Sequence, residues 1–146
     1  EVLTPVHRLS WRDLDSLRKS KEKTPFSGTC VVMDKNNKAL WFSKNIIPAI
    51  RNEEELRKDD PKQSPVHQHM GLYGYRMDIL ERFCALPQGQ YERLEGLEQL
   101  RLLENAITVQ CLPIILKSGI MQSGIDTVDD LARAEAMLAV MDRQAS

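Results

Sequence analysis

The sequence has no long apolar run and no excess of one charge. Its apolar runs are far shorter than the roughly 20 residues that span a bilayer, so we expect no membrane partner. The 146 residues include 20 basic and 21 acidic residues, which gives a net charge of -1. That balance predicts no general attraction to nucleic acid or to an anionic membrane. With 42% hydrophobic and 28% charged residues, the composition is typical of a soluble globular protein.

Several common site motifs are also absent. The three cysteines, Cys30, Cys84 and Cys111, form no CxxC pair, so a zinc ribbon or a redox motif is not indicated. Each lies among apolar residues, which predicts buried thiols in a reducing cytoplasm. The sequence has no GxxxxGK[ST] phosphate loop, and no spacing implies a Ser/His/Asp triad.

The pattern of apolar residues predicts a mixture of strands and helices. A hairpin is expected from Thr29–Met33 and Ala39–Ser43, which are rich in β-branched and aromatic residues and flank a polar turn. Further strands are expected at Val66–Tyr75 and Ile107–Leu112, and a strand also at the start of the chain. The charged stretch 51–64 is predicted to be an exposed loop, with one helical turn at most.

Helices are predicted from apolar residues at three- and four-residue spacing. Ser10 is expected to cap the first helix, and Met77–Leu86 is expected to form another. Leucines at three-residue steps predict one continuous apolar stripe: Leu94, Leu97, Leu100 and Leu103. The last helix is expected to be capped by Thr127 and to bury Leu131, Ala134, Leu138 and Met141. The mixture, with its hairpin, predicts an α/β fold whose sheet is not purely parallel.

The stretch HQHMGLYGYR, residues 67 to 76, places two histidines two residues apart. On a strand, His67 and His69 would point the same way. Two ligands are not a zinc site, which usually has three or four protein ligands. The pair by itself favours structurally satisfied histidines, while a polar His69 that faces a site stays open.

Two acidic stretches offer candidate ligand groups. Glu95 and Glu98 are three residues apart on the predicted leucine helix and are either solvated or, with Gln99, at the edge of a cleft. There a carboxylate and an amide would bind a polyhydroxylated ligand. Asp126 lies just outside the cap residue Thr127, where a carboxylate suits a hard cation such as magnesium. The alternative, that the acids only complement the helix dipole, fits Asp129 and Asp130 better.

Four blocks of the sequence resemble one family in their order and spacing. They are ALWFSKNIIP (39–48), HMGLYGYR (69–76), LEGLEQLRLLE (94–104) and SGIDTVDDLARAE (123–135). Together they resemble 3-deoxy-manno-octulosonate cytidylyltransferase, also called CMP-Kdo synthetase. The resemblance implies an α/β nucleotide-diphospho-sugar transferase fold with a mixed sheet, and a homodimer. It also implies a magnesium-dependent reaction of CTP with the acid sugar Kdo, giving CMP-Kdo and pyrophosphate for lipopolysaccharide synthesis in the bacterial cytoplasm.

The resemblance also implies roles for individual residues. Asp126 resembles the family's magnesium ligand, and His69 and Tyr73 resemble a pair that faces the Kdo sugar. Glu98 and Gln99 resemble an acid-amide pair that contacts the sugar hydroxyls. Lys44 stands where many members have arginine near the anionic sugar, which keeps the charge but loses the bidentate fork.

Two family motifs have no counterpart in this sequence. The R-x-x-S-x-R-[LF]-P-x-K-P loop that holds CTP and the Q-G-D-[EQ]-P block are both missing. We therefore expect residues 1–146 to be the C-terminal sugar-binding and dimerisation portion of one cytidylyltransferase domain, without its N-terminal CTP-binding half. By itself such a portion is expected to be inactive. The alternatives are a cytidylyltransferase for another acid sugar, sialic acid or amino-Kdo, and a non-catalytic sugar-binding or dimerisation module.

Overall fold

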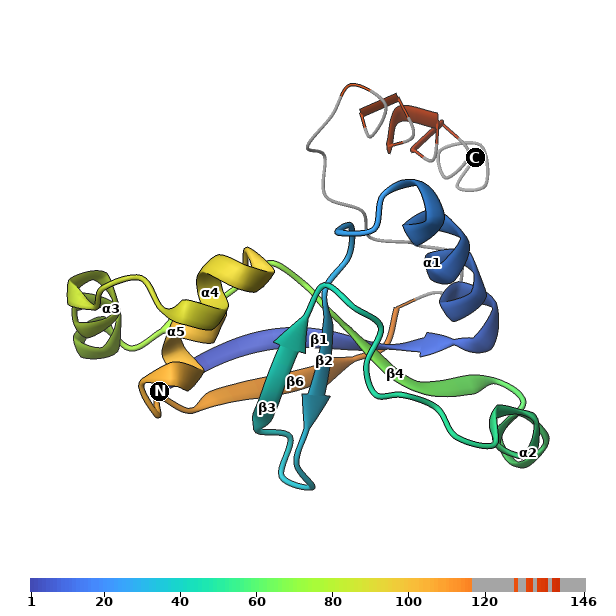
Figure 1. The fold of residues 1–146 in the computed structure, drawn as a ribbon, viewed down its shortest axis with the longest axis horizontal. Coiled ribbons are helices and arrows are strands. Elements are labelled where there is room, and N and C mark those ends of the chain that lie inside the picture. The colour runs from blue at the N-terminus through green and yellow to red at the C-terminus, as the bar shows by residue number, and fades with distance from the viewer. Residues whose placement is uncertain (117–127, 129–130, 133, 137, 140–146) are drawn as a thin grey trace.

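The computed structural model describes residues 1–116, 128, 131–132, 134–136 and 138–139 (Figure 1). Its strands are β1 (Val2–Ser10), β2 (Cys30–Met33), β3 (Ala39–Ser43), β4 (Gln63–His69), β5 (Gly74–Tyr75) and β6 (Val109–Ile114). Its helices are α1 (Trp11–Lys23), α2 (Glu53–Asp59), α3 (Met77–Ala85), α4 (Gln90–Glu95) and α5 (Gln99–Glu104). The α3, α4 and α5 helices gather at one end of the sheet, and α1 and α2 lie at the other (Figure 1).

The first strand is the centre of a mixed sheet. In the described residues the strand order is β3-β2-β4-β1-β5, and β6 pairs with β1 as well. The pairing of β1 with β4 is antiparallel, with Val6 opposite His69, while its pairing with β6 is parallel, with Val2 opposite Val109. The prediction of a sheet that is not purely parallel is therefore confirmed.

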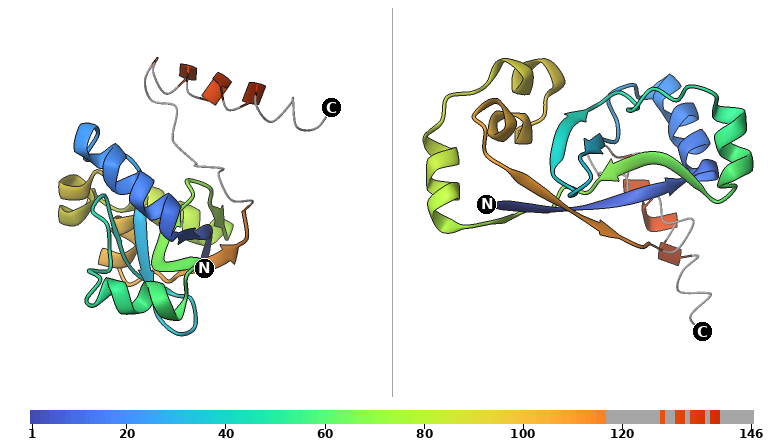
Figure 2. Two further views of the ribbon diagram at one scale, coloured as in Figure 1. Left: turned by 90° about the vertical axis from the view of Figure 1, so that its right-hand side faces the viewer. Right: turned by 90° about the horizontal axis from the view of Figure 1, so that it is seen from below.

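The sheet contributes to two hydrophobic cores because β1 changes its buried face. Val2 and Val6 pack in one core with residues of α3 and α5, among them Ile79 and Leu100. A register shift between Arg8 and Ser10 interrupts the alternation. Leu9 consequently packs in the second core, with Trp11 and other residues of α1. The helices therefore cover the sheet at its two ends, which the view from below also shows (Figure 2, right).

Local signals for the first helix and for the hairpin are confirmed. Ser10 Oγ accepts a hydrogen bond from the Asp13 N–H at 3.1 Å, as expected of a helix cap. Trp11, Leu14 and Leu17 are buried on one face of α1. The β2 and β3 strands pair antiparallel around the turn. The turn also meets β6, because the Cys111 N–H donates to the Asn37 carbonyl at 2.8 Å.

Several expectations about helices are wrong. The leucine stripe is not one helix, because Gly96 adopts the left-handed conformation (φ 63°) and ends α4, which leaves Leu94 72% exposed. The stretch 51–64 contains α2 and the start of β4. Contacts with α1 stabilise α2: Arg18 pairs with Glu53 at 2.6 Å, and the Arg57 guanidinium packs 4.5 Å from the Trp11 ring centroid.

Three further expectations need correction. Val66–Tyr75 is not one strand, since β4 ends at His69 and β5 begins at Gly74. Cys30 and Cys111 are buried as predicted, but Cys84 is exposed. The described residues from 128 to 139 are helical, yet Leu131 and Leu138 are 46% and 60% exposed rather than buried. Thr127 and Met141 lie outside the described residues.

Candidate functional site

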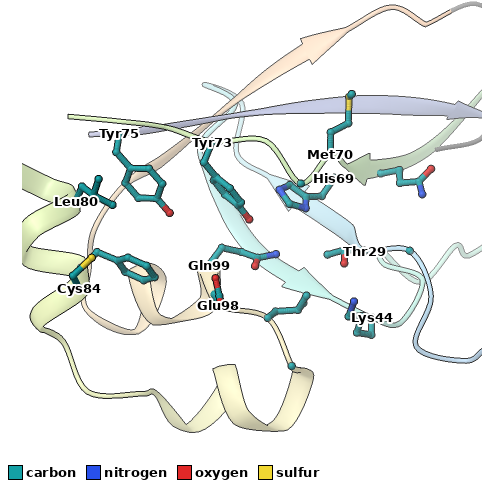
Figure 3. Close-up of a pocket in the computed structure, with 16 residues that line it drawn as sticks. Thr29, Lys44, His69, Met70, Tyr73, Tyr75, Leu80, Cys84, Glu98 and Gln99 are labelled. Atoms are coloured by element: carbon teal, nitrogen blue, oxygen red, sulfur yellow. The ribbon is translucent and has the colours of Figure 1, made fainter. Parts of the chain in front are cut away.

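A cavity of about 840 Å³ opens between the β4–β5 connection and the α3–α5 helices (Figure 3). Five residues singled out from the sequence line it together: Lys44, His69, Tyr73, Glu98 and Gln99. They come from three separate stretches of the chain, after β3, around the end of β4, and at the start of α5. The sequence blocks that suggested a site are therefore adjacent in space.

The interruption between β4 and β5 brings His69 and Tyr73 together. The His69 N–H donates to the Thr29 carbonyl at 2.8 Å, and the Met70 N–H donates to the Pro5 carbonyl at 3.1 Å. The chain then leaves the edge of β1 and returns at Gly74. The ring centroids of His69 and Tyr73 lie 5.3 Å apart. The two rings are close because the chain loops between β4 and β5, and not because both residues alternate on one strand, as the sequence suggested.

The His69 imidazole is held in the wall of the cavity. Its Nε2 lies 3.0 Å from the Oγ1 of Thr4, a fully buried residue of β1. Its ring packs edge-on against Phe42, with centroids 5.2 Å apart. Burial, and then the positive charge of Lys44, lowers the pKa of His69 to about 4. The ring is therefore neutral near pH 7.

The Tyr73 hydroxyl is a buried polar group of the cavity. Burial raises the pKa of Tyr73, and the nearby Tyr75 and Glu98 raise it further, so the phenol stays protonated. Its oxygen makes no hydrogen bond within the described part of the chain. A buried hydroxyl without a partner is costly. The cavity therefore contains a donor and acceptor that is ready for a ligand group.

The first residues of α5 supply an acid and an amide to the same cavity. Glu98 is exposed and directly precedes α5, whereas Gln99, its first residue, is buried. The tyrosine hydroxyls point toward the side of the cavity where Glu98 and Gln99 lie (Figure 3). The charge of Glu98 also raises the pKa of Tyr75, after the larger effect of burial. The arrangement suits a ligand with several hydroxyl groups.

The backbone of Lys44 is fixed on both sides, by Glu95, which the sequence offered as a ligand group, and by Lys21, which it did not single out. The Glu95 carboxylate accepts hydrogen bonds from Ser43 Oγ and from the Lys44 N–H, both at 2.8 Å. Glu95 is the last residue of α4 and Glu98 directly precedes α5, so the expectation that the two share one helix face is wrong. The Lys21 ammonium donates to the carbonyls of Lys44 and Gly28, and burial lowers the pKa of Lys21.

One end of the cavity is apolar and aromatic. It is lined by Tyr75, Leu80, Phe83 and Cys84, with Tyr75 stacked on Phe83 at a centroid distance of 5.9 Å. The opposite end carries Thr29 and Lys44 (Figure 3). Sequence reasoning placed 77–86 in a helix but assigned it no part in a site. The sequence feature that could have indicated a part for this helix in the site is that it follows the GLYGYR stretch directly.

Metal binding at the two histidines gains no support from the geometry. His67 does not line the cavity. Within the described residues, no group of three or more His, Cys, Asp or Glu side chains is arranged to hold a metal ion. Asp126, the carboxylate expected to bind magnesium, lies outside the described residues. Among the helices that are described, none has both the length and the apolar character to cross a membrane.

Comparisons with known proteins agree on one family. A sequence model of the cytidylyltransferases matches residues 12–110. A 3-deoxy-manno-octulosonate cytidylyltransferase of Phocaeicola vulgatus is 46% identical over 108 residues, covering 74% of this chain and 40% of that protein. The enzyme of the same name from Maricaulis maris is 37% identical over 139 residues, covering 95% of this chain and 51% of the relative. The chain thus spans two fifths to one half of these relatives.

A solved structure extends the likeness to the fold. CMP:2-keto-3-deoxy-manno-octonic acid synthetase, solved in complex with CTP, matches with a TM-score of 0.68 and 28% sequence identity. The match covers 96% of this chain and 49% of the other. The expected mixed α/β fold of the nucleotide-diphospho-sugar transferase type is therefore confirmed.

Proposed function

This chain belongs to the cytidylyltransferase family, and from that premise we propose that it forms the sugar-acid site of an enzyme that transfers a cytidylyl group from CTP to Kdo. One observation carries the proposal: the residues matched to the family's sugar-contact motifs line a single cavity. A buried Tyr73 hydroxyl without a partner in the described residues lies in the same cavity. Both features fit a ligand that is anionic and rich in hydroxyl groups.

The side chains divide the recognition of such a ligand. The Lys44 ammonium supplies the positive charge for a sugar carboxylate. The Glu98 carboxylate only accepts hydrogen bonds, so it selects a hydroxyl, while the Gln99 amide both donates and accepts. These contacts orient the sugar so that its anomeric hydroxyl faces the α-phosphorus of CTP.

In the proposed reaction, the anomeric hydroxyl loses its proton to solvent and its oxygen forms a bond to the α-phosphorus as the bond to pyrophosphate breaks. Chemistry of this kind depends mainly on positioning and on neutralising charge. The residues described here contribute the positioning of the sugar. Asp126 has the hard oxygen donor that magnesium prefers, and we propose it as a ligand. A bound magnesium ion would supply neutralisation of the triphosphate charge.

We further propose that the protein acts in the cytoplasm as a homodimer and supplies CMP-Kdo for lipopolysaccharide synthesis. The support is the resemblance of the four sequence blocks to the family. On the same ground we propose residues 1–146 as the sugar-binding and dimerisation portion of the cytidylyltransferase domain, with the Thr29–Ser43 hairpin as a candidate interface.

Pyrophosphate release from CTP and Kdo tests the proposal. The assay compares this chain with a chimera in which it replaces the matching segment of a curated relative. We expect Kdo-dependent release from the chimera, with loss of magnesium-dependent turnover in the Asp126→Asn variant and retention of its fold by circular dichroism. A chimera that binds Kdo and releases no pyrophosphate would favour the binding-module alternative. Faster release with sialic acid or amino-Kdo would reassign the substrate.

A further inference from the structure

Thr4 lies behind the cavity wall and contacts three groups of the His69–Tyr73 segment. It is fully buried in the middle of β1, where its neighbours on the strand pair with β4 and β5. Its Oγ1 lies 2.8 Å from the Leu72 carbonyl oxygen, 3.3 Å from the Met70 carbonyl oxygen and 3.0 Å from His69 Nε2. One hydroxyl therefore ties the imidazole to the backbone of the loop that follows it.

The single proton of this hydroxyl decides which His69 nitrogen carries hydrogen. Carbonyl oxygens only accept, so the proton of Thr4 Oγ1 goes to the nearer one, at Leu72. Otherwise two oxygens would lie 2.8 Å apart with no proton between them. Once Oγ1 donates to Leu72, it presents a lone pair to His69 Nε2, which must then carry the hydrogen.

The other ring nitrogen is left with its lone pair. A neutral imidazole has one N–H, so Nδ1 is an acceptor when Nε2 is protonated. Burial and the Lys44 charge disfavour the doubly protonated ring. Among the described residues, His69 Nδ1 has no hydrogen-bond partner, while the residue itself lines the cavity. His69 therefore offers a ligand an acceptor and not a second donor.

We propose that Thr4 is a positioning residue that fixes His69 in the Nε2–H tautomer, so that the ligand group facing His69 is a hydrogen-bond donor such as a sugar hydroxyl. A carboxylate, which only accepts, is excluded from that position and is left to the Lys44 end of the cavity. The identity of the ligand as Kdo rests on the proposed function, but the tautomer does not depend on it.

Nitrogen-15 NMR of the imidazole rings tests the tautomer without any ligand. The chain has three histidines, so His69 can be assigned by the loss of its signals in a His69→Gln variant. We expect the wild-type spectrum near pH 7 to show Nε2 protonated and Nδ1 unprotonated. The Thr4→Ser variant keeps the hydroxyl and should preserve this pattern. Thr4→Val keeps the branched shape, removes the acceptor for Nε2–H, and should give a mixture of tautomers.

Kdo binding supplies a second readout. We expect the affinity for Kdo to fall about tenfold in Thr4→Val and to stay within about twofold of wild type in Thr4→Ser. Added Kdo should move the Nδ1 resonance of the wild-type protein as an accepted hydrogen bond does.

An Nδ1–H tautomer in the wild-type protein would overturn the inference, as would an unchanged tautomer in folded Thr4→Val or an imidazolium ring formed on binding Kdo. If Thr4→Val does not fold, the wild-type spectrum alone decides. A protein with the expected tautomer that ignores Kdo would count against the proposed function and leave the role of Thr4 supported.

Discussion

Replacing Tyr73 by phenylalanine should stabilise the free protein and weaken its binding of the sugar acid. The substitution removes one oxygen, which is buried and has no hydrogen-bond partner in the described residues. The aromatic ring is kept, so the contacts with His69 and Tyr75, at centroid distances of 5.3 and 5.9 Å, remain. The variant therefore isolates the hydroxyl from the packing of the ring.

The size of the effect follows from the cost of an unsatisfied polar group. Burying a hydroxyl without a partner costs about 1–3 kcal/mol. Taking the lower end, we expect the free energy of unfolding to rise by about 1 kcal/mol and Tm by about 3 °C. If a sugar hydroxyl pairs with this group when bound, its loss should weaken affinity about fivefold, equivalent to about 1 kcal/mol.

Urea unfolding without ligand and calorimetric titration with Kdo measure the two effects separately. Tyr75→Phe is the matched control, because Tyr75 lines the same cavity but its hydroxyl is not an unpaired buried group. We expect the control to change stability by less than about 0.5 kcal/mol. Loss of stability in Tyr73→Phe by 1 kcal/mol or more would refute the reasoning, since it would mean that the hydroxyl already has a partner in the free protein.

Three other predictions concern the groups that hold the cavity wall. Glu95→Gln should weaken Kdo binding about threefold or more, because Ser43 Oγ and the Lys44 N–H donate to different oxygens of Glu95 and glutamine replaces one of these oxygens by an NH2 donor. Glu104→Gln, which changes a carboxylate that accepts from two backbone N–H groups outside the cavity, is the titration control. Lys21→Met should lower the free energy of unfolding by about 2 kcal/mol in urea, because the partly buried carbonyls of Ser27, Gly28 and Lys44 lose their donor. Lys23→Met on the exposed end of α1 should change it little. The pKa of His69 is lowered from 6.5 to about 4, so its contribution to stability is complete above pH 6.5 and is lost as the pH falls toward 4. Between pH 4 and 6.5, the free energy of unfolding of His69→Gln should change by about 2–3 kcal/mol less than that of the wild type. Equal changes in the two proteins would contradict the lowered pKa.

Local signals predicted the elements whose stabilising contacts are local. The Ser10 cap and the apolar face of α1 were readable because the interacting residues lie within two turns of each other. The hairpin was readable because its turn joins strands that are adjacent in the sequence. By contrast, the α2 helix has no buried residue of its own, and besides its internal pair of Glu53 with Arg57 its ion pairs are with Asp15 and Arg18 of α1. Nothing within 51–64 could have revealed those partners.

In two places where the prediction was wrong, the sequence contains glycines that indicate the interruption. Gly96 stands in the middle of the leucine stripe, and glycine is the residue that most readily adopts the left-handed conformation that ends a helix. Gly71 and Gly74 likewise stand in the stretch read as one strand. Glycine inside a strand pattern indicates a bulge or an interruption. The three-residue spacing of the leucines and the two-residue alternation of the predicted strand each continue across a glycine where the regular structure is interrupted.

Residues that line the candidate site could be predicted from the sequence, but the residues that hold them in position could not. Lys44, His69, Tyr73, Glu98 and Gln99, which line the cavity, were found because they lie in sequence blocks that resemble motifs of one family. The supporting roles of Thr4, Lys21 and Glu95 could not be predicted, although Glu95 was considered as a ligand group, because each contacts a partner at least 23 residues away in the sequence.

The supporting residues determine which groups of the lining residues are free to bind a ligand. Both backbone polar groups of Lys44 are occupied, by Glu95 and Lys21, so its backbone is held without using the ammonium. The backbone N–H of His69 is likewise paired with Thr29, and one ring nitrogen is paired with Thr4. The backbone and buried contacts therefore fix the wall, while an ammonium, an imidazole nitrogen and a phenol remain for the ligand. Because a fixed wall has less conformational freedom to lose on binding, its supporting residues should influence affinity without touching the ligand.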